Sequence, residues 1–159
     1  MPARRSPRQV IRAAEGERYG PASPLFKHGS LTGAPFDFLV VNMDYLSGPP
    51  LHVHELQHDT FYVVEGVLTV QIADEVIELK PGDFASVPPG VPHTFDNTRK
   101  DQPPVKLCNV MTPGGLDAFF VKLTEDGTPP DPAKFAAVGA QCGMTFVGPP
   151  LAVRLGLTK

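Results

Sequence analysis

The sequence is poor in several residue types, and each shortage excludes a class of protein. It has no tryptophan and only two cysteines, Cys108 and Cys142, which lie far apart and outside any pairing motif. Two such cysteines do not indicate a disulfide framework, and we expect free thiols, which are compatible with a reducing compartment. Charged residues make up only 19% of the chain, and the formal net charge is −3. Such a charge provides no general attraction for nucleic acid or for an anionic membrane.

Long apolar runs are absent as well. The arginines near the N-terminus, Arg4, Arg5, Arg8 and Arg12, are followed by no apolar segment long enough for a secretory signal or a membrane span. We therefore expect a cytoplasmic protein with no membrane and no nucleic-acid partner.

What the sequence has in quantity is proline and glycine, 19 and 15 residues. Both residue types favour chain reversals, so the composition indicates short elements joined by many turns. From Phe36 to Met111 short β-branched or apolar runs alternate with turn residues, and no helical period is sustained. This pattern predicts a small all-β sandwich or barrel with antiparallel strands.

The periodicity changes after residue 113. An apolar stripe at Leu116, Phe119, Phe120 and Leu123 has helical spacing and predicts one short helix. A second helix is indicated by an N-cap aspartate, a proline at the first helical position and a glycine stop, at Asp131, Pro132 and Gly143. We expect an N-terminal arm or edge segment over residues 1–30, a barrel over 31–113 and a C-terminal helical extension over 114–159.

One short stretch, LHVHELQHD, concentrates residues that bind metals. Side chains two residues apart in a strand face the same way, so His52 and His54 present two imidazoles on one face. The chain must reverse directly afterwards, and an antiparallel return brings the carboxylate of Asp59 alongside them. His58 is a rival ligand, but the alternation from Asp59 points it away from the interior. A further histidine, His93, follows the rigid turn Pro88-Pro89-Gly90.

These four residues form a mixed nitrogen and oxygen set. Such a set suits one borderline divalent metal, iron, nickel, manganese, cobalt or zinc. Six apolar residues are candidates for lining a substrate pocket, although an ordinary core role is an equally good interpretation for them. They are Phe38, Met43, Phe61, Val63, Phe95 and Met111.

The two segments resemble the paired motifs of the cupin superfamily. The second motif, G-x5-P-x-G-x2-H-x3-N, is met in full by Gly82, Pro88, Gly90, His93 and Asn97. The first, G-x5-H-x-H-x(3–4)-E-x6-G, is met at His52, His54 and Gly66, with Asp59 in the place of the usual glutamate and the leading glycine displaced to Gly48. The likeness is greatest to single-domain cupins related to quercetin dioxygenases.

The resemblance implies a fold and a chemistry. The fold is a single-domain jelly-roll cupin β-barrel with short C-terminal helices, and the metal lies in the mouth of the barrel on His52, His54, Asp59 and His93. The activity is that of a quercetinase-like dioxygenase acting on an enolisable aromatic or polyketide-like small molecule, with Asp59 as the catalytic base. Homodimers are common in the family, and we expect one here.

Two other functions remain open from the sequence. The same site without oxygen chemistry would serve a metal-dependent isomerase, cyclase or dehydratase, and a cupin can also bind a small ligand without catalysis. The number of open positions on the metal depends on whether the carboxylate of Asp59 reaches it, because aspartate is shorter than glutamate by about 1.5 Å. If its carboxylate lies outside the ligand sphere, the metal is held by three histidines and has more open positions.

Overall fold

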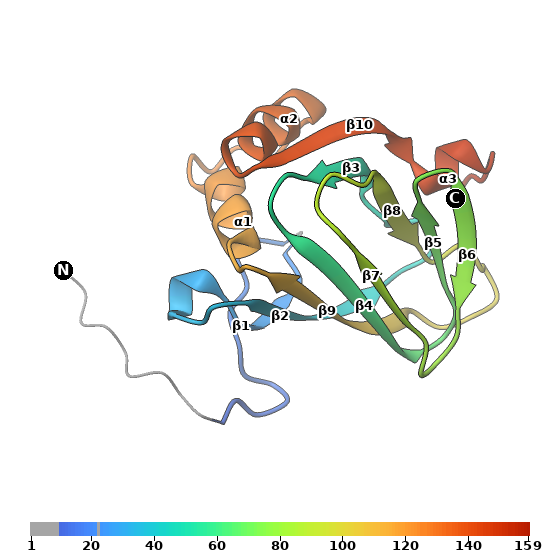
Figure 1. The fold of residues 1–159 in the computed structure, drawn as a ribbon, viewed down its shortest axis with the longest axis horizontal. Helices are drawn as coiled ribbons and strands as arrows, with labels where there is room; N and C mark the ends of the chain where they lie inside the picture. Colours follow the sequence, from blue (N-terminus) through green and yellow to red (C-terminus); the bar gives the residue numbers. More distant parts are fainter. Residues whose placement is uncertain (1–9, 22) are drawn as a thin grey trace.

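The protein is represented by a computed structural model that describes residues 10–21 and 23–159. Within these residues the strands form two antiparallel sheets of five strands that face each other (Figure 1). The first sheet has the order β1 (Leu25–His28), β2 (Asp37–Met43), β9 (Val105–Thr112), β4 (His58–Glu65) and β7 (Phe84–Val87). The second has the order β10 (Met144–Pro150), β3 (Pro50–His54), β8 (His93–Asp96), β5 (Leu68–Ile72) and β6 (Glu75–Leu79). The expected all-β jelly roll is confirmed, built as two packed sheets rather than as one closed ladder.

The main core fills the space between the two sheets. Strand β4 shows how it forms, because Asp59, Phe61 and Val63 are buried while the side chains between them face outward. Phe61 and Val63 pack in one cluster with residues of both sheets, including Val70 and Leu107. Asp59 shares this inward face, so the alternation of β4 places a carboxylate at the end of an apolar core.

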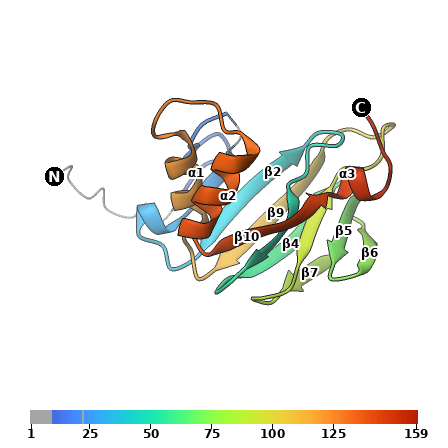
Figure 2. The same cartoon turned by 90° about the horizontal axis from the view of Figure 1, so that it is seen from above.

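Two helices close one end of the sheets (Figure 2). They are α1 (Leu116–Thr124) and α2 (Pro132–Gln141), and both predicted helices are confirmed. Asp131 caps α2 by accepting a hydrogen bond from the backbone N–H of Lys134 at 2.8 Å. Among the described residues, no helix combines the length and the apolar character needed to cross a membrane.

A buried carboxylate from the first sheet fixes the start of α1. Gly115 precedes the helix and has no side chain to cap it. Asp37 on β2 takes this role, accepting from the backbone N–H groups of Gly115 at 2.9 Å and Leu116 at 2.7 Å. Because the first N–H groups of a helix have no partner within it, this contact attaches α1 to the sheet at a defined position.

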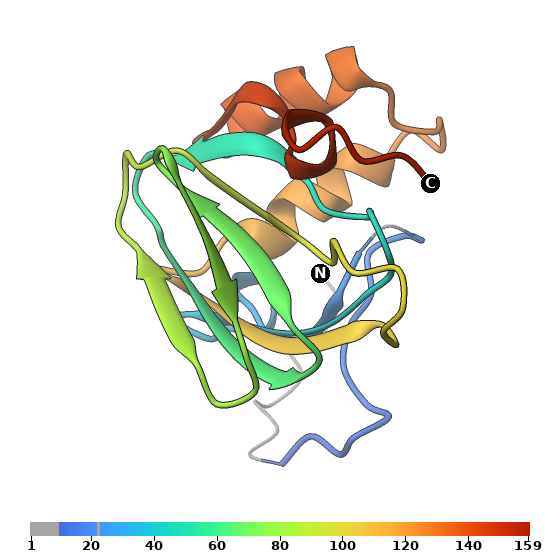
Figure 3. The same cartoon turned by 90° about the vertical axis from the view of Figure 1, so that its right-hand side faces the viewer.

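The C-terminal extension is not only helical, in contrast to the expectation for residues 114–159. Strand β10 pairs with β3, with Phe146 opposite His52 and Met144 opposite His54, and the short helix α3 (Leu151–Arg154) follows it. The C-terminal segments, orange and red, lie above the green strands in Figure 3. Strand β10 was not predicted from the sequence because it ends in Gly-Pro-Pro, a run that disfavours a central strand. Prolines are tolerated in β10 because it is an edge strand.

The predicted N-terminal arm lies partly outside the described residues. Within its described part, β1 pairs with β2 and forms the edge of the first sheet.

Candidate metal centre

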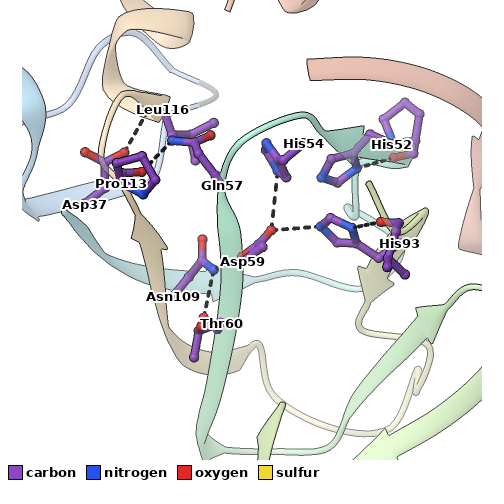
Figure 4. Close-up of polar contacts among 12 residues, drawn as sticks. Asp37, His52, His54, Gln57, Asp59, Thr60, His93, Asn109, Pro113 and Leu116 are labelled. Carbon is purple, nitrogen blue, oxygen red and sulfur yellow. Dashed lines mark hydrogen bonds and ion pairs between the residues drawn. The ribbon is translucent and has the colours of Figure 1, made fainter. Parts of the chain in front are cut away.

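Three strands from both sheets bring the four predicted ligands together. His52 and His54 come from β3 and His93 from β8, all in the second sheet, whereas Asp59 is the second residue of β4 in the first sheet. His52 and His93 are direct register partners, and their ring centroids are 4.5 Å apart. One ligand atom from each of the four residues lies within 4.8 Å of the other three (Figure 4).

All four side chains are removed from solvent. The exposed fractions are 4% for His52, 3% for His54, 3% for Asp59 and 1% for His93. His58 is exposed, as the alternation along β4 predicts, and it does not belong to this group. Burying imidazoles and carboxylates costs free energy unless they are paired or bind a cation, so the burial of these four side chains favours a bound cation.

Backbone carbonyl groups orient two of the rings. The Nδ1–H of His52 donates to Pro50 O at 2.8 Å, and the Nδ1–H of His93 donates to Val91 O at 2.9 Å. A carbonyl can only accept, so Nδ1 carries a proton in both rings and Nε2 is the nitrogen that faces the other ligands. Contacts of this kind commonly fix metal-binding histidines in place.

The charge states of His52 and Asp59 also favour the binding of a cation. Burial, together with the neighbouring rings of His93 and His54, lowers the pKa of His52 to about 3, so this ring is neutral near neutral pH. Burial alone would raise the pKa of Asp59, but its contacts with His54 and His93 outweigh burial and hold the pKa below its usual range. The site therefore combines a neutral imidazole at His52 with one carboxylate at Asp59.

The distances within the group fit one metal ion. Asp59 Oδ2 lies 3.0 Å from His93 Nε2 and 3.6 Å from His54 Nε2. Two ligands on one metal at bond lengths of roughly 2.0–2.2 Å are separated by about 3–4 Å. His54 Nδ1 is buried and has no hydrogen-bond partner, so this ring has a free nitrogen. The residues present therefore fit a divalent metal such as those of the borderline series.

A fifth polar residue, Asn109 on β9, was not anticipated. Its amide donates to Asp59 Oδ1 and to the carbonyl oxygen of Thr60, the latter at 3.0 Å, and its side chain is only 4% exposed. Asn109 thus holds one carboxylate oxygen and leaves Oδ2 to face the histidines. The sequence contained a signal for it: in the run VKLCNVM the inward positions are Val105, Leu107, Asn109 and Met111, and one of them is polar.

The metal-binding group opens into a cavity of about 530 Å³. Of the six predicted pocket residues, Met43 and Phe95 line it. Phe61 and Val63 instead belong to the main core, and Met111 to a second cluster with Phe26 and Leu39. Phe38 lies on β2 with the outward alternation.

Most of the residues that line the cavity are not among the six that the sequence predicted. Aromatic side chains of α1, α2 and β10 line it, namely Phe119, Phe120, Phe135 and Phe146. The Phe146 ring is 6.0 Å from that of His52, between centroids. Most of the aromatic part of the wall is therefore built by α1, α2 and β10, whose positions local alternation in the strands does not encode.

Comparisons with known proteins identify the family. Residues 39–111 match the family model of the cupin domain. The chain is 31% identical over 117 residues to a quercetin 2,3-dioxygenase from Bacillus subtilis (strain 168), which covers 72% of this chain and 34% of that protein. It is 32% identical over 82 residues to a quercetin 2,3-dioxygenase from Aspergillus japonicus, covering 48% of this chain and 23% of that protein.

A solved structure is similar over a larger share of its own length. A sugar phosphate isomerase from the cupin superfamily of Silicibacter pomeroyi DSS-3 matches with a TM-score of 0.51 and 25% identity, covering 66% of this chain and 70% of that one. The chain belongs to the cupin superfamily. It spans only about a third and a quarter of the two dioxygenases that it matches in sequence.

Proposed function

We propose that this cupin is a metal-dependent oxygenase of the quercetinase-like group, acting on an enolisable aromatic or polyketide-like small molecule. The observation that carries the proposal is the buried group of three histidines and one aspartate at one end of a cavity walled by aromatic rings. The sequence likeness to two quercetin 2,3-dioxygenases supports the choice of chemistry.

In this proposal His52, His54, His93 and Asp59 hold one divalent metal per chain. When bound, such a metal acts as a Lewis acid toward an enolic or hydroxyl oxygen and, if redox-active, supplies the route to dioxygen. Asp59 Oδ2 accepts the proton of the substrate hydroxyl, because its other oxygen is occupied by the amide of Asn109. The apolar wall excludes water and orients the ring system of the substrate.

A second candidate function is isomerisation without oxygen. The likeness to a cupin-superfamily sugar phosphate isomerase favours it. It would use the same four ligands and the same proton acceptor, with a metal that need not change oxidation state. Homodimerisation and a cytoplasmic location stay predictions.

The first test is metal content by plasma mass spectrometry on protein purified without a histidine tag. We expect about one divalent metal per chain in the wild type and its loss in His93→Ala. His58→Ala is the matched control, because it removes an exposed histidine next to Asp59 and should retain the metal. Full occupancy in His93→Ala would contradict the assignment of the ligands.

The second test separates the two functions. Protein reconstituted with iron, nickel, manganese, cobalt or zinc is mixed with a flavonol in an oxygen electrode. Oxygen uptake that depends on a redox-active metal supports the oxygenase. Turnover of an enolisable substrate that proceeds equally with zinc under anaerobic conditions would instead support the isomerase.

A further inference from the structure

Few charged groups line the cavity beside the metal-binding group. Among the described residues that line it, the side chains with a formal charge are Asp59 at the metal-binding group and Arg18. Asp59 is buried, whereas Arg18 is exposed and therefore marks an opening of the cavity. The cavity thus carries a metal-binding end and a cationic rim.

Aromatic rings connect these two ends. From His52 the contacts run through Phe146, Phe135 and Phe119 to Phe120, with centroids between 5.2 and 6.0 Å apart. All four phenylalanines line the cavity. A ligand that reaches from the metal-binding group to the rim therefore lies against a continuous aromatic wall, which favours a flat, aromatic body.

The contacts continue past Phe120 to the residue next to Arg18. Phe120 contacts Phe26 at 5.9 Å, and Phe26 contacts Tyr19 at 5.5 Å. Glu17 and Phe26 also exchange backbone hydrogen bonds of 2.9 Å in both directions. In Figures 1 and 2 this blue N-terminal segment runs beside α1. The residues on both sides of Arg18 are thus attached to β1, which sets the position of its backbone at the rim.

Most of the N–H donors of the Arg18 guanidinium group are available to a ligand. Its Nη1 donates to Ser23 O at 3.0 Å, which uses one of five N–H donors and holds the side chain across the loop. No acidic side chain among the described residues forms an ion pair with it. A charged guanidinium with free donors beside an apolar cavity matches the geometry of a carboxylate, phenolate or sulfonate.

We propose that the ligand of this cavity is an aromatic acid, with a flat apolar body along the phenylalanine wall and an anionic group that pairs with Arg18 at the rim. The inference deepens the proposed function, because it assigns the substrate class of the same site. It depends on the shape and charge of the cavity rather than on the reaction, so it is testable without metal and without turnover.

The test uses two fluorescent probes of nearly the same shape. 8-Anilinonaphthalene-1-sulfonate carries an anionic group, and N-phenyl-1-naphthylamine is the neutral counterpart. Each is titrated into apoprotein at low ionic strength, for the wild type and for Arg18→Gln, Arg18→Lys and Arg154→Gln. Arg154 is the matched control, because it is exposed, lies outside the cavity and also donates to a backbone carbonyl, that of Asp74 at 3.1 Å.

We expect the wild type to bind the anionic probe more tightly than the neutral one. Arg18→Gln should weaken the anionic probe by about fivefold, as expected for an ion pair at an exposed rim, and leave the neutral probe unchanged. Arg18→Lys should keep most of the affinity, Arg154→Gln all of it, and added salt should reduce the difference between the probes.

Three outcomes would overturn the proposal: an unchanged affinity for the anionic probe in Arg18→Gln, an equal loss in Arg154→Gln, or no binding of either probe. None of these would affect the metal content or the oxygen uptake of the loaded protein. A failure of the aromatic-acid ligand is therefore distinguishable from a failure of the proposed oxygenase.

Discussion

Replacing Asn109 by leucine tests how the carboxylate of Asp59 is held. The two side chains are similar in size, so the change removes the two amide hydrogen bonds without opening a large cavity. Both acceptors, Asp59 Oδ1 and Thr60 O, then lose a buried donor. An unsatisfied buried acceptor costs about 1–3 kcal/mol, so we expect a loss near 3 kcal/mol in unfolding free energy. For a chain of this size that is roughly 6–12 °C in Tm.

The effect on metal binding is the more specific readout. Residues that orient a metal ligand typically change the affinity by about 10–100-fold, and we expect zinc to bind Asn109→Leu more weakly by this factor. Scanning fluorimetry of the apoprotein gives the Tm, and competition with a fluorescent chelator gives the zinc affinity. Asn42→Leu, at an exposed position on β2, is the control for the same chemical change. A lowered Tm with wild-type zinc affinity would refute the orienting role and leave Asn109 as a purely structural residue.

Two further predictions concern the apoprotein and the cavity wall. Because burial keeps the pKa of His52 at about 3 in the folded protein against 6.5 for a free side chain, the unfolded chain takes up this proton first on acidification. The unfolding free energy should therefore fall as the pH drops from about 6.5 towards 3, seen as lower urea midpoints, and an equal slope in His52→Gln would contradict this. Gly139→Val places a Cβ 2.8 Å from Met144 O, where α2 packs on β10, and should cost about 1–3 kcal/mol in thermal unfolding. A wild-type Tm in that variant would contradict such tight packing.

The metal-binding residues of β3 and β4 and the second helix could be predicted from short sequence patterns. The alternation of His52 and His54 and the inward parity of Asp59 follow from the two-residue period of a strand, and the structure buries all three. The second helix was predictable because an N-cap aspartate followed by proline is a local signature, and Asp131 caps α2 in the structure.

The cavity wall was not predictable in the same way. Parity along β4 correctly assigns Phe61 and Val63 to the interior, but it does not say where the facing sheets are in contact and where they diverge. Most of the aromatic part of the wall comes instead from helices α1 and α2 and from β10, whose positions depend on pairing and packing between segments far apart in the sequence. Arg18 is a comparable case, because nothing in its local sequence connects it to a cavity.

The aspartate at position 59 leads to a final prediction, since related cupin motifs carry glutamate there. Glutamate would extend the carboxylate by about 1.5 Å. In this protein Asp59 Oδ2 is already 3.0 Å from His93 Nε2, and Asn109 contacts its other oxygen, so a longer side chain on the same backbone cannot keep both contacts unchanged. Asp59→Glu should therefore weaken zinc binding by about tenfold, although it restores the usual residue of the motif. Asn109→Ala in the same chain makes room for the longer side chain and should recover part of that affinity. Equal or tighter zinc binding by Asp59→Glu alone, in the chelator competition assay, would mean that the shorter carboxylate and Asn109 are not adapted to each other.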